Sequence, residues 1–172
     1  MKIHSREEYS ILLNQVRGTV LTACINLEII IDLYIAEKIC DTKDKINEMT
    51  SLILTPRVSL REKLEIFKVL IAKYNPEFKD KKGNFYNDLK NIIEHRNVFA
   101  HLPASVSDEG LDEYNNKGNF MFYKFKNFTD EATKEIGYSR VPIYTNDSID
   151  EILSACNTYI TSIKEMLRTT KK

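Results

Sequence analysis

Apolar residues recur at intervals of three and four along most of the chain, the spacing that places side chains on one face of an α-helix. The first such segment runs from about Ser5 to about Cys40. Ser5 is followed three residues later by Glu8, a combination typical of a capping box at a helix start. Gly18 leaves open whether the segment is one kinked helix or two. The pattern therefore predicts a long helical segment at the N-terminal end.

The next part of the chain alternates between polar and apolar stretches. Residues 41–48 are polar and break the helical pattern, and residues 49–54 form a short apolar piece that Pro56 stops. After this piece, Ser59 can cap a helix with one apolar stripe. That helix is predicted to end before Pro76.

A further amphipathic helix is predicted after a solvated connector at residues 79–83, with Asn84 as its cap. Its apolar stripe continues at spacings of three and four, and Arg96 occupies a position on that stripe where a hydrophobic residue is expected. Proline disfavours helical geometry in the residue before it. Pro103 should therefore end this helix at or just after His101.

The character of the chain changes before the last helix, where Gly, Asn, Asp and aromatic residues become frequent. Residues 119–126 and 138–144 alternate in the manner of β-strands. We interpret them as a β-hairpin inserted at about 118–145. A final helix follows, capped by Asn146 or Ser148.

The composition fits one ordinary globular domain. A chain of 172 residues with 42% hydrophobic residues is sufficient for one core, so we expect a single, mainly α-helical domain over residues 1–172. Lys plus Arg and Asp plus Glu both number 25, so the formal net charge is zero. This balance excludes a wholly basic nucleic-acid surface but not a local basic patch.

The cysteines and the N-terminus indicate the compartment. Cys24, Cys40 and Cys156 are odd in number and lack a C-x-x-C pairing, which favours buried or half-buried thiols in a reducing compartment. No uninterrupted apolar run approaches the roughly 20 residues that cross a bilayer. The polar N-terminus carries no hydrophobic region of a signal peptide. We therefore expect a cytoplasmic protein without a membrane partner.

Arg96, Asn97 and His101 form the most chemically suggestive group in the sequence. Asn97 and His101 share a helix face, whereas Arg96 lies about 140° from His101, so its side chain must reach round the helix or the helix must end first. RNA is cleaved without metal when a base removes the proton of the 2′-hydroxyl and a cation stabilises the phosphorane. Imidazole suits the first task near neutral pH, and the guanidinium fork suits the second. The group predicts a ribonuclease site that needs neither metal nor cofactor.

The same residues also have a purely structural interpretation, which spacing alone favours. An Arg near the C-terminal dipole of a helix, an Asn as partial cap and a His bound to the last carbonyls are ordinary features of a helix end. Against this interpretation stands the position of Arg96, because a buried charge needs a partner or a function. Glu28 or Asp32 on the first helix are candidate partners, and an ion pair with either would make Arg96 structural.

Segment 96–101 resembles the mark of the HEPN (higher eukaryotes and prokaryotes nucleotide-binding) family, in which an Arg, often followed by a polar residue, precedes a His near the end of a helix. Segments 26–32, 59–67 and 92–97 also look like this family. The resemblance covers roughly residues 5–102 and the last helix. It implies an up-and-down helical bundle, to which the hairpin is an insertion outside the minimal pattern.

The resemblance also implies an activity and partners. Arg96 would stabilise charge, His101 would act as base or acid, and Asn97 would be the adjacent polar residue of a metal-independent endoribonuclease leaving a 2′,3′-cyclic phosphate. Such an enzyme would be a homodimer whose two motifs face each other across a cleft. Many similar proteins look like toxins or phage-defence effectors held by an antitoxin protein. Other members keep the fold without activity, so the alternative is a non-catalytic protein-interaction module.

The first strand of the hairpin supplies the predicted RNA contacts. Lys124 and Lys126 alternate there with aromatic residues, and aromatic rings can stack on bases while lysines bind phosphates. The competing interpretation is a hairpin whose aromatic residues pack on the helices. His95 and His101 lie on different helix faces, so they predict no metal site. The glycines never cluster into a phosphate-binding loop.

Overall fold

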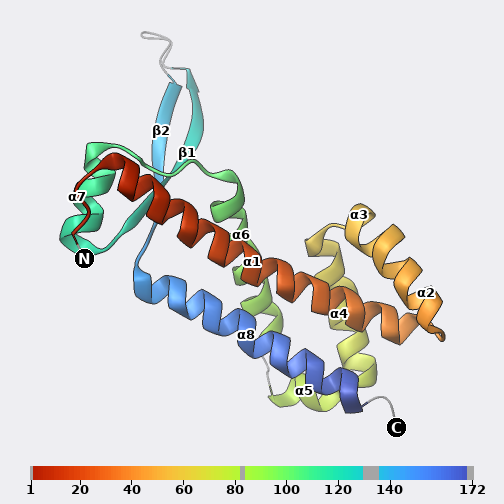
Figure 1. Cartoon of the computed structure of the whole chain (residues 1–172). Helices are drawn as coiled ribbons and strands as arrows, with labels where there is room; N and C mark the ends of the chain where they lie inside the picture. Colours follow the sequence, from red (N-terminus) through yellow and green to blue (C-terminus); the bar gives the residue numbers. More distant parts are fainter. Residues whose placement is uncertain (1, 82–83, 130–135, 170–172) are drawn as a thin grey trace. The chain divides into compact units, whose positions relative to one another are not determined.

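The computed structural model describes residues 2–81, 84–129 and 136–169, apart from the side chains of 79–81, 124–129 and 136–142. Its elements, in chain order, are α1 (Arg6–Ile39), α2 (Lys43–Glu48), the π-helical turn η1 (Met49–Leu54), α3 (Thr55–Arg57), α4 (Leu60–Tyr74), α5 (Pro76–Lys81), α6 (Phe85–His101), α7 (Asp108–Lys117), β1 (Phe120–Thr129), β2 (Ile136–Tyr144) and α8 (Asn146–Thr169) (Figure 1). Strands β1 and β2 pair antiparallel. The mainly α-helical class and the hairpin before the last helix are therefore confirmed.

Helix α1 passes through Gly18 as one helix. A β-carbon at Gly18 would meet no atom within 4 Å, so this glycine marks an exposed position and not a break. The hydroxyl of Ser5 accepts from the N–H of Glu8 at 3.2 Å, as a cap should, while the Glu8 carboxylate accepts from the N–H of His4 at 2.9 Å. The predicted start is thus confirmed, with the reciprocal bond shifted by one residue.

The first two long helices are separate, as predicted, but most of the segment between them is helical and not a simple break. Helix α2 follows a Thr42 cap and continues through η1 into α3, so the chain stays helical past Pro56. Proline cannot donate its nitrogen and its ring needs space in the preceding turn, and a widened π turn meets both needs. The expected connector is also helical in part, because α5 begins at Pro76, a residue suited to the first turn of a helix.

Helix α7 was not predicted. Its signals are its ends: Ser107 accepts from the N–H of Gly110 at 3.3 Å, and Gly118 adopts the left-handed conformation at φ 71° that favours glycine. The sequence between them is largely polar, so the periodicity of apolar residues is too weak to reveal it. The start of α8 was misplaced by one residue, since Thr145 and Ser148 exchange reciprocal capping bonds of 2.9 and 3.1 Å.

The chain forms two compact units. The first unit combines Met1–Leu21 with Arg96–Ile152, and the second combines Thr22–His95 with Leu153–Lys172.

The core of the first unit is aromatic. The ring of Tyr9 lies 5.5 Å from that of Tyr114 and 6.4 Å from that of Phe120, which joins α1 to α7 and β1. The start of the chain is fixed to α7 by the bond from the N–H of Ile3 to Asn115 Oδ1 at 2.9 Å. Figure 1 shows α7 beside the beginning of α1, as these contacts require.

The second unit packs α4, α5 and parts of α1, α6 and α8 around a core that includes Tyr34 and Phe67, whose rings meet edge to face at 5.0 Å. The Tyr159 hydroxyl donates to Asp88 Oδ2 at 2.6 Å and so ties α8 to α6. Cys24 and Cys156 are buried, as expected, they form no disulfide, and their thiols are hydrogen-bonded to each other. This bond lowers the pKa of Cys156.

Of the helices that the structure describes, α1 is long and apolar enough to cross a membrane by length and composition. Half of its most apolar stretch is buried inside the protein. A core helix of a soluble protein satisfies the same criterion, and the polar residues that interrupt the run, Glu28 and Asp32, are used within the fold as described below.

Tyr9 is expected to make the first unit sensitive to alkaline pH. Burial raises the pKa of this fully buried phenol to about 12, above the value near 10 of an exposed tyrosine. The resulting stabilisation is complete below pH 10 and is lost as the pH rises through 12. Tyr9→Phe should therefore lose less stability than the wild type over this range, by on the order of 2 to 3 kcal/mol.

Urea unfolding followed by circular dichroism at several pH values measures this difference. Tyr74→Phe, at an exposed position, is the matched control and should keep the wild-type profile. Identical profiles for Tyr9→Phe and the wild type would show that the Tyr9 phenol does not govern alkaline stability.

Candidate functional site

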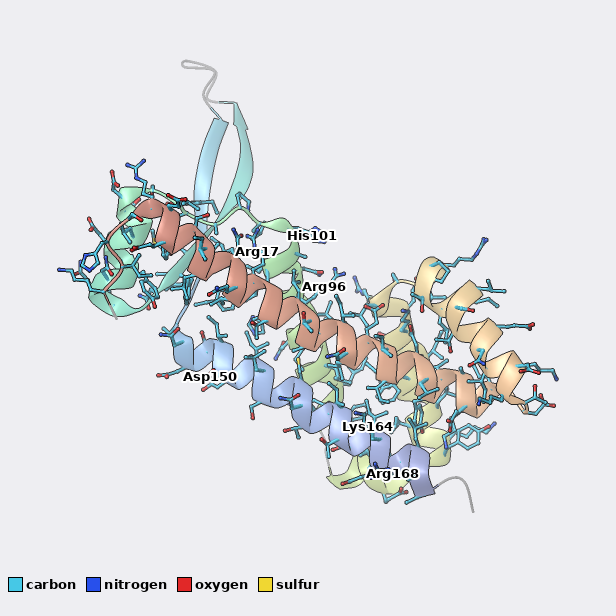
Figure 2. All side chains as sticks on the ribbon, viewed as in Figure 1. Arg17, Arg96, His101, Asp150, Lys164 and Arg168 are labelled. Atoms are coloured by element: carbon cyan, nitrogen blue, oxygen red, sulfur yellow. The ribbon has the colours of Figure 1, made fainter. Side chains whose placement is uncertain are left out.

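The three predicted catalytic residues lie in the last two turns of α6, within the first unit. Asn97 and His101 are exposed, and Arg96 is half-buried. The helix extends to His101, as Pro103 predicts, so it does not end between Arg96 and His101. Figure 2 shows both residues on α6, beside the part of α1 that carries Arg17.

The guanidinium of Arg96 is oriented by its neighbour. Its Nη1 donates to Asn97 Oδ1 at 3.1 Å. A guanidinium has five N–H donors in a planar fork, and this bond uses one of them. Asn97 therefore holds the fork of Arg96 at the exposed end of the helix, a contact that the sequence alone does not predict.

Glu28 and Asp32, the candidate partners of Arg96, both bind a different cation. Lys63 Nζ lies 2.6 Å from Glu28 Oε1 and 2.8 Å from Asp32 Oδ2, and the Lys63 side chain is 0% exposed. All three residues belong to the second unit. Burial raises the pKa of Asp32, and the bond from Lys63 opposes that rise.

The apolar stripe predicts α4 as an amphipathic helix but does not by itself single out Lys63. A signal was present, because Lys63 lies four residues before the buried Phe67 and beside the buried Leu64. At that spacing a lysine shares the apolar face of the helix. A lysine on such a face needs a carboxylate, and Glu28 and Asp32 on α1 are the acidic residues that the sequence placed in an apolar run.

The end of α6 is anchored by Phe99, which stands between Asn97 and His101 in the sequence. Phe99 is 0% exposed, and its ring lies 5.0 Å from that of Phe122 and 4.8 Å from that of Tyr144. Both rings belong to the hairpin. Phe99 is thus a core residue of the first unit and is not available for contact with a partner chain.

The segment that follows the motif pairs with β1. The N–H of Tyr123 donates to the carbonyl of Pro103 at 2.9 Å, and the N–H of Ser105 donates to the carbonyl of Met121 at 2.9 Å. Ala104 forms an isolated bridge with Phe122. The hairpin therefore belongs to the structure that fixes the end of α6, and it is not an appendage to it.

Arg17 is a further cation at the same helix end. Its Nη2 donates to the carbonyl of Leu102 at 2.7 Å, and its guanidinium carbon lies 5.8 Å from the centre of the Phe122 ring. The sequence carried a signal for it, because Arg17 falls between the buried Leu13 and Val20 on the apolar face of α1.

The predicted RNA contacts are placed only in part. Lys124 lies on β1 opposite Ser139, and the side chains of Lys124 and Lys126 lie outside the described residues. Two of the aromatic residues proposed for base stacking, Phe120 and Phe122, are buried in the first unit. These two rings pack in the core, as the competing interpretation of the hairpin holds.

The chemistry available at the α6 end is that of the side chains themselves. Within residues 2–81, 84–129 and 136–169, no group of three His, Cys, Asp or Glu side chains is placed to hold a metal ion. Burial lowers the pKa of the half-buried His95, which favours its neutral form. An exposed imidazole and an oriented guanidinium can bind a phosphate and exchange a proton with an adjacent hydroxyl.

Comparisons with protein-family models, with curated proteins and with solved structures give no match to this chain.

Proposed function

We propose that this chain is a metal-independent endoribonuclease of the HEPN type that acts in the cytoplasm as a homodimer. The observation that carries the proposal is that one helix end bears both the exposed His101 and an Arg96 guanidinium that Asn97 orients. An anchored backbone with exposed polar side chains is what a catalytic group requires.

The reaction divides between these residues. His101 takes the proton of the ribose 2′-hydroxyl, and the 2′-oxygen attacks the adjacent phosphorus. Arg96 stabilises the doubly charged phosphorane, and Asn97 holds the fork of Arg96 in place. The bond from phosphorus to the 5′-oxygen breaks, the 5′-oxygen takes up a proton, and the products are a 2′,3′-cyclic phosphate and a 5′-hydroxyl. A homodimer supplies a second imidazole as the acid.

The biological setting follows from the family resemblance. An enzyme that needs no cofactor is active as soon as it folds, so the cell must restrain it. We therefore propose a toxin or phage-defence effector that an antitoxin protein holds inactive.

The test is cleavage of labelled single-stranded RNA by the purified protein in the presence of EDTA. A matched oligonucleotide carrying 2′-deoxyribose at the cleaved position is the control, since it lacks the attacking hydroxyl. We expect cleavage of the RNA with a 2′,3′-cyclic phosphate end and none of the control. Absence of cleavage by a folded protein on varied RNAs, or cleavage of both substrates, would refute the proposal.

A second candidate function is a non-catalytic HEPN-like interaction module. It is favoured by exposed aliphatic side chains in the second unit, among them Ile25 and Ile29, which are four residues apart on α1, and Val69 on α4. Exposed apolar residues on one helix face are typical of protein contacts. A folded protein that cleaves no RNA would leave this second function as the better explanation.

A further inference from the structure

Arg17 is the residue that this inference concerns. Arg17 belongs to α1 and lies 79 residues before Arg96 in the sequence. It contacts the end of α6 through a backbone carbonyl. Its Nη2 binds the carbonyl of Leu102, the residue directly after His101, at 2.7 Å. The N–H of Leu102 in turn donates to the carbonyl of Val98 at 3.0 Å and closes the last turn of α6.

The charge of Arg17 suits this position. The carbonyls at the C-terminal end of a helix carry a partial negative charge, and a cation there is stabilising. The planar guanidinium also faces the Phe122 ring at 5.8 Å, and Phe122 packs on Phe99. One side chain therefore touches both supports of the helix end, the carbonyl after His101 and the ring that anchors Phe99.

The half-buried guanidinium of Arg17 is held on two sides, by the Leu102 carbonyl and by the Phe122 ring. Its Nε is buried and, among the described residues, has no hydrogen-bond partner. A donor that water cannot reach is not available to an RNA phosphate. The fixed place of the guanidinium thus points to an indirect role.

We propose that Arg17 is the positioning residue of the site: by binding the Leu102 carbonyl it holds the backbone of His101, and with it the imidazole, in register with the guanidinium of Arg96. This inference rests on the proposed function for its catalytic consequence. Its structural half concerns only Arg17, Leu102 and His101. Displacement of a catalytic group by about 1 Å is enough to slow a reaction by up to about 100-fold.

The experiment compares Arg17→Met with Arg17→Lys, which keeps a charged donor for the carbonyl. Arg6→Met is the matched control, because it removes a guanidinium from the same helix in the same unit, where Arg6 pairs with Asp108 on the surface. The first readout is the NMR signal of the His101 imidazole, one of three histidines in the chain, together with amide exchange at Leu102.

We expect Arg17→Met to shift or broaden the His101 signal and to speed exchange at Leu102, Arg17→Lys to restore both in part, and Arg6→Met to change neither. Unchanged signals in Arg17→Met would overturn the inference, whether or not the protein cleaves RNA. If the wild type cleaves no RNA but Arg17→Met still shifts the His101 signal, the ribonuclease proposal is refuted and the positioning role of Arg17 stands.

The second readout is RNA cleavage. Loss of position should lower kcat by about 10- to 100-fold and leave KM for RNA within about twofold. Arg17→Lys should regain part of the kcat. A rise in KM at constant kcat would make Arg17 a phosphate-binding residue, and an unchanged kcat in a protein with displaced His101 would make it merely structural; either result overturns the inference.

Discussion

Lys63→Met is expected to lower the free energy of unfolding of the second unit by about 3 to 5 kcal/mol, the effect of removing one partner from a buried ion pair. The Lys63 side chain is fully buried and binds Glu28 and Asp32. Methionine is unbranched and only one heavy atom shorter than lysine, but it leaves the buried Asp32 carboxylate without its cation. The loss of stability therefore comes mainly from the unpaired buried charge and not from a cavity.

Urea unfolding followed by circular dichroism measures this loss. Lys164→Met, at an exposed position of α8 in the same unit, is the matched control and should change stability by less than about 0.5 kcal/mol (Figure 2). A triple variant that combines Lys63→Met with Glu28→Gln and Asp32→Asn should recover part of the loss, because no charge remains buried.

The pH dependence identifies the mechanism. Without Lys63 the pKa of Asp32 in the folded protein rises further above its unfolded value near 3.8. A carboxyl with a raised pKa stabilises the fold below its unfolded pKa and loses this contribution as the pH rises through the folded value. The difference in the free energy of unfolding between Lys63→Met and the wild type should therefore become smaller as the pH falls toward 4. A difference that is equal at all pH values, or no larger than that of Lys164→Met, would contradict the stranded-charge explanation.

The periodicity of apolar residues predicts some elements of the fold well and others poorly. Regular spacing located α1, α4, α6 and α8 because each has an apolar face that packs against a partner. It missed α7, whose sequence is polar, and it misread the segment around Pro56, because a short apolar run has no measurable period. Spacing describes one helix at a time and carries no information on which side chains of two helices meet.

Lys63 and Arg17 lie beyond the reach of that method for the same reason. Each is a cation on an apolar helix face, and the sequence can reveal that placement. Its partner lies far along the chain, and the sequence does not reveal which residue that is. For Arg96 the same observation suggested an internal ion pair with Glu28 or Asp32. In the structure those carboxylates bind Lys63, and Arg96 donates a hydrogen bond to Asn97, its neighbour in the sequence.

The hairpin changes the picture of the candidate site most. In the sequence it stands as an insertion with its own RNA contacts, whereas in the structure Phe122 and Tyr144 enclose Phe99 from the motif itself. A residue in the middle of the Arg-to-His segment is thereby buried while its neighbours Asn97 and His101 are exposed. The hairpin thus supports the end of α6 through ring contacts to Phe99 and through backbone bonds to the segment after His101.

Within the proposed function, His101→Ala is expected to lower kcat for RNA cleavage by about 10² to 10⁴, the usual contribution of a general base or acid. Arg96→Ala should lower it by about 10² to 10³ through loss of charge stabilisation, and Arg96→Lys should recover little of this, because an ammonium has no planar fork. His101 is exposed and Arg96 is half-buried, so the midpoint of thermal unfolding should change little in these variants.

His4→Ala is the matched control for these variants, since it removes another exposed histidine from the same unit. Cleavage is measured with EDTA present and with each variant checked for its fold by circular dichroism. Retention of wild-type rates in His4→Ala beside their loss in His101→Ala and Arg96→Ala assigns the activity to the α6 end and excludes a co-purified nuclease. Equal rates in all four proteins would mean that Arg96 and His101 do no more than terminate a helix, and the case for catalysis at this end of α6 would fall with them.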